Sequence, residues 1–318
     1  MKKNRTEIVA WLIEKRIFVL LVFFIILAVL FVPLFATPIN LSNLLSQLTI
    51  DGVVVIGMTI LMVAFGIDLS VGSTLALAGI IYALLAGTGV AIPLAILGAV
   101  LVGGLVGLTN GLIVTKLRIN FFIATLATMV AIRGLAITLA NGQVVYPGVS
   151  GFDWIGRQQA GPIEVPVIVF LVTAIVAHFV LSQTRLGRYW YAIGGNREAA
   201  QRVGLKVDRY YIMAFVVTGL CAGLAGVLLA ARANSASPSV GVETNLIAIA
   251  STVIGGTSLY GGVGTIPGAV AGLLLVNILR NSLNLLGVSP YYQYLVRGVI
   301  LIGVVVMDAY FGWRRRVV

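Results

Sequence analysis

Four charged residues interrupt the apolar stretches of this 318-residue sequence, and they are the side chains best placed to do chemistry there. They are Asp51, Asp68, Arg133 and Arg297. A charge at the centre of a membrane-spanning helix costs about 2.5–3.5 kcal/mol, so each of these residues needs a function or a partner. In a carrier such groups bind protons or ions within the path, and Asp68 and Arg133 are the candidates for that role.

Asp68 lies in the stretch 66–73, which reads G-I-D-L-S-V-G-S and separates two apolar runs. A carboxylate at this point could accept hydrogen bonds from the backbone near Ser70 and Val71 and so cap the following helix. It could also contact a transported molecule directly, and the sequence leaves both interpretations open. Arg133 is the most membrane-central charge and is predicted to face a polar cavity or a partner group.

Uncharged polar residues are also set in apolar runs, where they could line a path through the protein. The alternative for each of them is a hydrogen bond between helices. The candidates for a translocation path or gate are Asp68, Ser70, Asn110, Arg133, Ser251 and Asn277, and similar residues are Asn43, Gln47, Thr125, Thr128 and Thr252.

The chemistry of energy conversion has no motif in this chain. The sequence contains no G-x-x-x-x-G-K-[ST] loop and no Gly-Lys dipeptide, so ATP hydrolysis by the chain itself is not expected. One Cys and one His leave no ligand set for a metal ion and no nucleophilic triad. We therefore expect neither an enzyme nor a metal ion or cofactor.

Composition identifies the elements that must position these residues. The chain is 60% hydrophobic and only 10% charged, with a mean hydropathy of +1.08. A soluble domain carries about 25% charged residues, so a soluble protein, a disordered chain and a nucleic-acid-binding module are excluded. The continuous apolar runs are about twice as long as the strands of a membrane barrel. The sequence predicts an all-α polytopic membrane protein.

About ten spans are expected, because apolar windows of about 20 residues recur with short breaks. The segment 245–256 is too short to cross alone and is predicted to be a half-helix or to extend at one end. Five spans on each side of the loop 141–162 would suit two five-helix repeats of inverted topology. The predicted spans are 17–36, 47–66, 70–87, 92–114, 121–140, 163–182, 210–232, 245–256, 265–283 and 293–311.

Charge predicts the orientation of the single membrane-spanning domain 1–318. With the N-terminus inside, sixteen of the 21 Lys and Arg residues fall on the cytoplasmic side. Segments 1–16 and 183–209 are then cytoplasmic, loop 141–162 is external and both termini are inside, as in a bacterial inner-membrane protein. The net charge of +11 is thus an orientation signal and not a nucleic-acid footprint. The inside residues are Lys2, Lys3, Arg5, Lys15, Arg16, Lys116, Arg118, Arg185, Arg188, Arg197, Arg202, Lys206, Arg209, Arg314, Arg315 and Arg316.

The basic loop contains a short helix signal between Tyr191 and Asp208. Asn196 is a good N-cap, Glu198 falls in the first turn, and Gly204 can end the helix. Gly194 and Gly195 before it are expected to form a flexible entry. The helix could fit a groove on a cytoplasmic partner or lie on anionic lipid headgroups.

This segment resembles the coupling helix of bacterial ABC-importer permeases, because Glu198, Ala199, Ala200 and Gly204 match the E-A-A…G pattern of that family. The whole chain resembles the sugar branch of the branched-chain amino acid/ribose permease family. Four stretches in the family order carry this resemblance, namely 66–73, 194–204, 253–264 and 281–293.

The resemblance implies a permease subunit that moves a monosaccharide, a ribose-like pentose or a hexose, across the membrane. It implies two permease subunits, by default a homodimer in membrane lipid. Separate ATPase subunits would bind the coupling segment, namely Gly195, Asn196, Arg197, Glu198, Ala199, Ala200 and Gly204. A periplasmic or lipidated binding protein would deliver the sugar. The alternatives are a self-sufficient ten-helix secondary transporter and a branched-chain amino acid permease of the same superfamily.

Overall fold

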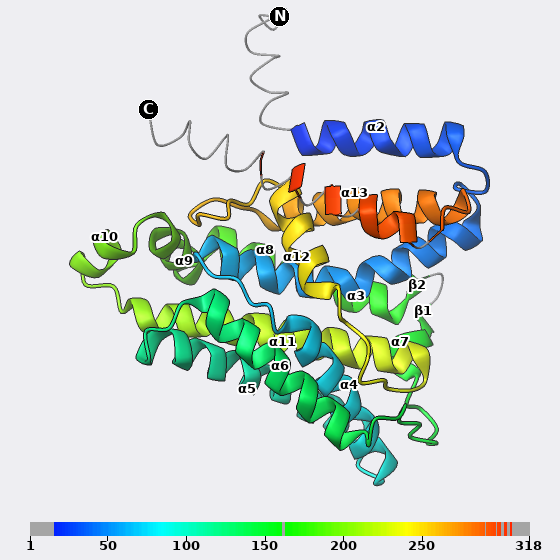
Figure 1. Ribbon diagram of the computed structural model, residues 1–318, viewed down its shortest axis with the longest axis horizontal. Coiled ribbons are helices and arrows are strands. Elements are labelled where there is room, and N and C mark those ends of the chain that lie inside the picture. Colours follow the sequence, from blue (N-terminus) through cyan, green and yellow to red (C-terminus); the bar gives the residue numbers. More distant parts are fainter. Residues whose placement is uncertain are drawn as a thin grey trace, which may run out of the picture.

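The computed structural model describes residues 16–160, 163–289, 291–296, 298–299, 302–303 and 306, and the described chain is predominantly helical (Figure 1). One antiparallel hairpin of two short strands, β1 (Gln159–Ala160) and β2 (Ile163–Glu164), accompanies the helices. The helices are α2 (Arg16–Phe31), α3 (Pro38–Val63), α4 (Val71–Gly87), α5 (Ile92–Lys116), α6 (Phe121–Leu139), α7 (Trp154–Arg157), α8 (Val165–Gln183), α9 (Arg185–Gly195), α10 (Arg197–Arg202), α11 (Val207–Ala233), α12 (Thr244–Ile254) and α13 (Ile266–Leu285).

Six of the described helices are long and apolar enough to cross a membrane, namely α3, α5, α6, α8, α11 and α13. Three shorter apolar helices, α2, α4 and α12, accompany them. Helix α3 is the most buried of the six, and it contacts α8, α11, α12 and α13. Few side chains of helices α6 and α8 are fully buried, as expected of helices that face lipid. The all-α polytopic fold predicted from composition is confirmed.

The predicted spans from 17–36 to 265–283 each overlap a described helix. The tenth, 293–311, is only partly described, and its described residues are helical. Residues 1–15, Arg297 and the basic C-terminus 314–316, which entered the orientation argument, lie outside the described part of the chain.

One predicted boundary is wrong, because α3 begins at Pro38 and not near residue 47. Its first turns are polar, so they lack the apolar composition from which the spans were predicted. The Asn40 amide exchanges hydrogen bonds with Asn281 at 3.0 and 2.8 Å, and Ser46 Oγ donates to Glu164 at 2.7 Å. Asp51, expected a short way into this helix, therefore lies near its middle.

Two spans are interrupted in the same way. A non-helical segment, 64–70, precedes α4, and another, 234–243, precedes α12. In Figure 1 these segments enter from opposite ends of the molecule and each reaches its middle before the helix begins. Each interrupted span is the third of its predicted half, so the arrangement is the one that two inverted repeats would give. Segment 245–256 is a half-helix.

The rows of small residues bring helix backbones into close contact. Gly103 and Gly107 of α5 lie against Gly219, Gly223 and Phe215 of α11, where a Cβ on either glycine would meet backbone atoms. Close approach of this kind is how small residues hold helices together in a membrane. This row of glycines therefore packs two helices of the same subunit against each other.

The two ends of the bundle differ in their elements. Helices α9 and α10 cover one end, and α7 with the hairpin β1–β2 covers the other (Figure 1). Lys116 Nζ lies 3.8 Å from Asp208 Oδ2, which places the end of α5 beside the start of α11, and Arg197 of α10 lies 3.1 Å from the same carboxylate. The basic residues of 116–118 and 183–209 therefore share one end, as the charge argument required.

Candidate functional site

A buried polar cluster occupies the break between α3 and α4. Asp68 is only 1% exposed, and its Oδ1 accepts hydrogen bonds from the Ser70 backbone N–H at 2.8 Å and from Ser70 Oγ at 2.6 Å. Asn110 Nδ2 of α5 donates to Asp68 Oδ2 at 3.1 Å and to Ser70 Oγ at 2.9 Å. Three of the six predicted path residues therefore contact one another. The predicted bond to the Ser70 N–H is confirmed, and the hydroxyl and amide of the cluster add further donors.

The two interrupted spans meet beside this cluster. Gly72, at the start of α4, packs so closely on Gly241 that a Cβ on it would overlap the Gly241 carbonyl oxygen. Asn245 Nδ2 of α12 donates to the Leu69 carbonyl at 3.3 Å. Only glycine allows two backbones to approach this closely, so Gly72 and Gly241 fix the point where the two half-helices begin.

Arg133 now has named partners. Its guanidinium donates to the carbonyl oxygens of Pro238 and Val240, the latter at 2.7 Å, so α6 is tied to the segment that precedes α12. The predicted polar partner is thus backbone, not a carboxylate. Pro238 and Val240 lie in a non-helical segment, where their carbonyl oxygens need donors from elsewhere in the protein. Hydrogen bonds from the Arg133 guanidinium supply these donors and also pair the charged group.

Ser251 and Asn277 lie elsewhere, on α12 and α13. Ser251 is buried between these helices, where Gly272 packs against its carbonyl oxygen, and it is not among the residues that line the groove of Asn277. Asn277 is 3% exposed, and its Nδ2 has no hydrogen-bond partner among the described residues. The six predicted residues therefore form no single site.

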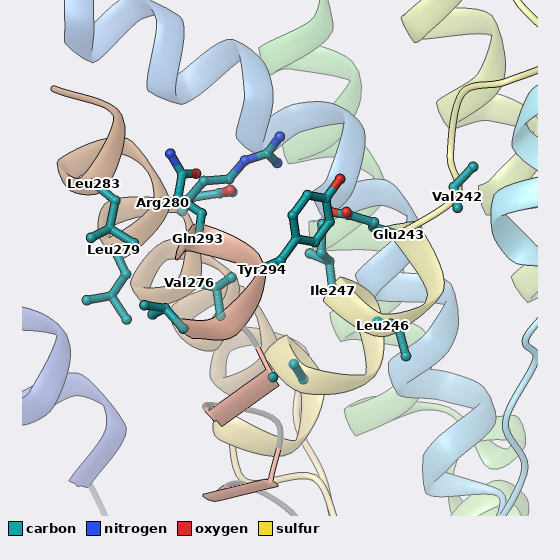
Figure 2. Close-up of a pocket in the computed structure, with 14 residues that line it drawn as sticks. Val242, Glu243, Leu246, Ile247, Val276, Leu279, Arg280, Leu283, Gln293 and Tyr294 are labelled. Carbon is teal, nitrogen blue, oxygen red and sulfur yellow. The ribbon is translucent and has the colours of Figure 1, made fainter. Parts of the chain in front are cut away.

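Asn277 lines a groove of about 340 Å³ between α12, α13 and the helical residues after 291. Figure 2 shows Arg280 beside Gln293 and Tyr294 near Glu243, with leucine and valine side chains around them. Gln293 Nε2 is held by Asn284 Oδ1 at 2.8 Å and by the Val288 carbonyl at 2.9 Å. Mostly apolar walls with a few polar groups are typical of small-molecule sites.

The sequence argument did not select Arg280, Gln293 or Glu243 as groove residues. Arg280 follows Asn277 by three positions, which places both on one helix face, and this spacing could have pointed to it. Gln293 ends one of the four stretches on which the family resemblance rests. Nothing in the local pattern around Glu243 predicts that it faces the groove.

The predicted coupling helix is α10, and the end of α9 occupies the part of the segment before Asn196. Asn196 separates α9 from α10 and caps the second, because its side chain accepts a hydrogen bond from the Ala199 N–H at 2.9 Å. Glu198 lies in the first turn of α10, and Gly204 follows the helix with φ +83°. These three predictions are confirmed.

Two details of the segment differ from expectation. Gly194 and Gly195 are the last residues of α9, and Gly194 is buried, so they are not a flexible entry. Ala200 is 4% exposed and points into the protein, which leaves Ala199 as the exposed alanine of the pair. Only one of the two small residues is therefore available to a partner.

Arg197 anchors α10 to the bundle. Its Nη2 lies 3.1 Å from Asp208 Oδ1, and its guanidinium lies 5.0 Å from the centre of the Tyr211 ring. Tyr191 of α9 donates its hydroxyl to the Gly264 carbonyl, and burial raises the pKa of this hydroxyl above its ordinary value. The hydroxyl therefore stays protonated as a donor.

The described residues contain no group of three or more His, Cys, Asp or Glu that could hold a metal ion.

Residues 40–305 match the protein family described as branched-chain amino acid transport system/permease component. The chain is similar to the ribose import permease protein RbsC of Escherichia coli strain K12, with 40% identity over 94% of both chains. It is 41% identical to the ribose import permease protein RbsC of Bacillus subtilis strain 168, over 87% of this chain and 86% of that one. The L-arabinose ABC transporter permease protein AraH of Azospirillum brasilense is 38% identical over 96% of this chain and 91% of its own. No solved structure matches the chain.

Proposed function

Because the chain belongs to the branched-chain amino acid transport system/permease component family, we propose that it is the membrane-spanning permease of an ABC importer for a monosaccharide. The observation that carries the proposal is the 40% identity to a ribose import permease over 94% of both chains. Relatives named for ribose and for L-arabinose make a pentose the first substrate to test. The chain has no nucleotide-binding loop, so ATP hydrolysis is assigned to separate subunits.

The ATPase subunits are proposed to dock on the end covered by α9 and α10. Gly195, Asn196, Glu198 and Ala199 are exposed on this end, whereas Ala200 is not. The basic residues that share it support a cytoplasmic location, since positive charge accumulates on that side. Both termini are placed in the cytoplasm on the same argument.

The opposite end, with loop 141–162, is proposed to face the binding protein that delivers the sugar. Helix α7 and the hairpin lie there (Figure 1). Glu164 ties the hairpin to α3 through Ser46 and through Ser42, whose Oγ lies 3.3 Å from Oε1. A second permease subunit, by default another copy of this chain, completes the importer.

We place the sugar path along the groove that Asn277 lines. A buried amide without a partner costs about 1–3 kcal/mol, and a sugar hydroxyl that accepts from Nδ2 would recover this cost. Both Asp68 carboxylate oxygens, the Ser70 hydroxyl and Asn110 Nδ2 are engaged within the cluster, and Asn110 Oδ1 has no partner among the described residues. The paired carboxylate favours a role of Asp68 in holding α4 and α12 over direct contact with sugar. Switching between inward- and outward-facing states would then be a rigid-body change in helix packing.

Reversing the charge at Glu198 tests the coupling role. Glu198→Lys places a positive charge in the first turn of α10, where the helix dipole disfavours it, on a side chain that is largely exposed. We expect uptake of labelled D-ribose to be lost and the ATPase subunits no longer to co-purify, with unchanged membrane insertion. Gly204→Asp should act in the same way. Normal uptake by both variants would contradict the proposal.

Transport by the permease alone separates the alternatives. In liposomes without ATPase subunits, the proposal predicts no uptake of D-ribose down an imposed proton or sodium gradient. Gradient-driven uptake would favour a secondary transporter. In the full importer, inhibition of D-ribose uptake by excess L-leucine would favour a branched-chain amino acid permease, and inhibition by L-arabinose would favour a pentose permease.

A further inference from the structure

Four glycines join the coupling segment to the loop that carries the groove helices. Gly194 and Gly195 end α9, and Gly261 and Gly262 lie in the loop 255–265 between α12 and α13. We call these four residues the glycine junction. A Cβ on Gly194 would overlap the Val63 carbonyl oxygen, and a Cβ on Gly262 would lie 2.8 Å from the Gly195 Cα. The two segments therefore meet backbone to backbone.

Hydrogen bonds lock the same contact. The Gly262 N–H donates to the Val63 carbonyl at 2.9 Å, and the Tyr191 hydroxyl donates to the Gly264 carbonyl. From the other side, the Tyr211 hydroxyl donates to the Phe65 carbonyl at 2.9 Å, and Tyr211 lies under the Arg197 guanidinium of α10. The end of α3 is thus held between the coupling segment and the loop.

The loop is in turn fixed to both groove helices. Thr265 Oγ1 accepts a hydrogen bond from the Gly268 N–H at 3.1 Å and caps α13. Gly255, which ends α12, packs on the backbone of Gly268, and Gly272 packs on the Ser251 carbonyl. Because these backbones are close-packed with no free space between them, a displacement of the loop displaces α12 and α13 together.

We propose that the glycine junction transmits movement of α9 and α10 to α12 and α13, with Gly194, Gly262 and Tyr191 as its positioning residues. This inference rests on the proposed function, because it assumes that ATPase subunits move α10. It adds the route within the subunit: the coupling segment reaches the groove through loop 255–265 and the end of α3. The Asp68 cluster is not on this route.

The test compares two alanine substitutions in the same loop. Gly262 (φ +70°) and Gly256 (φ +91°) both have backbones that strain any other residue, but only at Gly262 does a Cβ meet a neighbour within 4 Å. Gly256→Ala is therefore the matched control for Gly262→Ala. Tyr191→Phe removes one hydrogen bond and adds no atom.

The measurement is the number of D-ribose molecules moved per ATP hydrolysed, by the reconstituted importer with its ATPase subunits and binding protein. We expect this ratio to fall about tenfold in Gly262→Ala and about threefold in Tyr191→Phe, within the range of coupling between sites. Gly256→Ala should leave it unchanged. A loss of folded protein alone lowers uptake and hydrolysis together and leaves the ratio constant, so an unchanged ratio in Gly262→Ala and Tyr191→Phe would overturn the proposal.

Hydrogen exchange of the permease without partners tests the contact independently of transport. Gly262→Ala is expected to speed exchange in residues 192–195 of α9 as well as in loop 255–265, and Gly256→Ala to change the loop alone. If both variants change only the loop, the junction does not link the two segments, even if the protein transports D-ribose. If exchange follows the prediction and the unsubstituted importer moves no D-ribose, the junction stands and the proposed substrate fails.

Discussion

The break around Asp68 and the groove around Asn277 both place polar side chains deep in an apolar protein, but they differ in how the hydrogen-bond donors are paired. Both Asp68 carboxylate oxygens accept hydrogen bonds and Asn110 Nδ2 serves two acceptors, while Asn110 Oδ1 has no partner among the described residues. Asn277 Nδ2 has no partner among the described residues and belongs to a side chain that lines a cavity of about 340 Å³.

On the proposed function, this difference separates polar groups that hold the fold from polar groups that serve the sugar. A polar group whose partners lie within the protein stabilises one arrangement, here the meeting of two half-helices. A polar group that lines a cavity without a partner is available to a ligand, and it costs stability until the ligand arrives. Burial and residue type alone do not distinguish the two, because both asparagines are almost completely buried.

Removal of the Asp68 carboxylate should cause the largest loss of stability. In Asp68→Ala the Ser70 N–H and hydroxyl lose their acceptor and the Asn110 amide loses one of its two, all at buried positions, which should cost about 3 kcal/mol. The expected result is a lower thermal unfolding midpoint in detergent and much less protein in the membrane. The protein that does fold should transport D-ribose at a near-normal rate per molecule. A normal midpoint with lost transport would place Asp68 in the path instead.

Arg133→Leu should have an intermediate effect. The Pro238 and Val240 carbonyls lose a charged donor, which should cost about 2 kcal/mol. Arg157→Leu is the matched control, because Arg157 Nε donates to the Arg232 carbonyl at 2.7 Å from an exposed position. Solvent can replace that bond, so the control should change the unfolding midpoint little. Equal losses in both variants would argue against a special role of the Arg133 contacts.

Much of the fold could be predicted from the sequence because apolar runs record which segments cross the membrane. The prediction failed at the start of α3, because its polar residues have hydrogen-bond partners that are distant in sequence. Asn40 bonds to α13, and Ser46 bonds to Glu164 at the start of α8. It also predicted only a short break at 66–70, whereas the non-helical segment 64–70 reaches the middle of the molecule (Figure 1). A polar stretch with tertiary partners has the same composition as a loop.

For the candidate site, the sequence identified residue types but not their grouping. Asp68, Ser70 and Asn110 were selected separately as polar residues in apolar surroundings, and only the fold brings α5 to the break after α3. The backbone partners of Arg133 could not be predicted, because carbonyl oxygens have no sequence signature. The glycines at 194 and 262 look like loop residues until their close contact is known.

The same substitution at two asparagines tests the comparison most directly. Asn277→Leu and Asn110→Leu each replace a buried amide with a side chain of similar size, and both unfolding midpoint and D-ribose uptake per inserted molecule are measured. Asn277→Leu should keep or raise the midpoint and lower uptake about tenfold, the worth of one hydrogen bond of roughly 1.4 kcal/mol. Asn110→Leu should lower the midpoint and leave uptake per molecule within about threefold of normal, because lost stability reduces the number of molecules rather than their rate. Normal uptake by Asn277→Leu, with a lower rate per molecule in Asn110→Leu, would contradict the assignment of the groove to the sugar path.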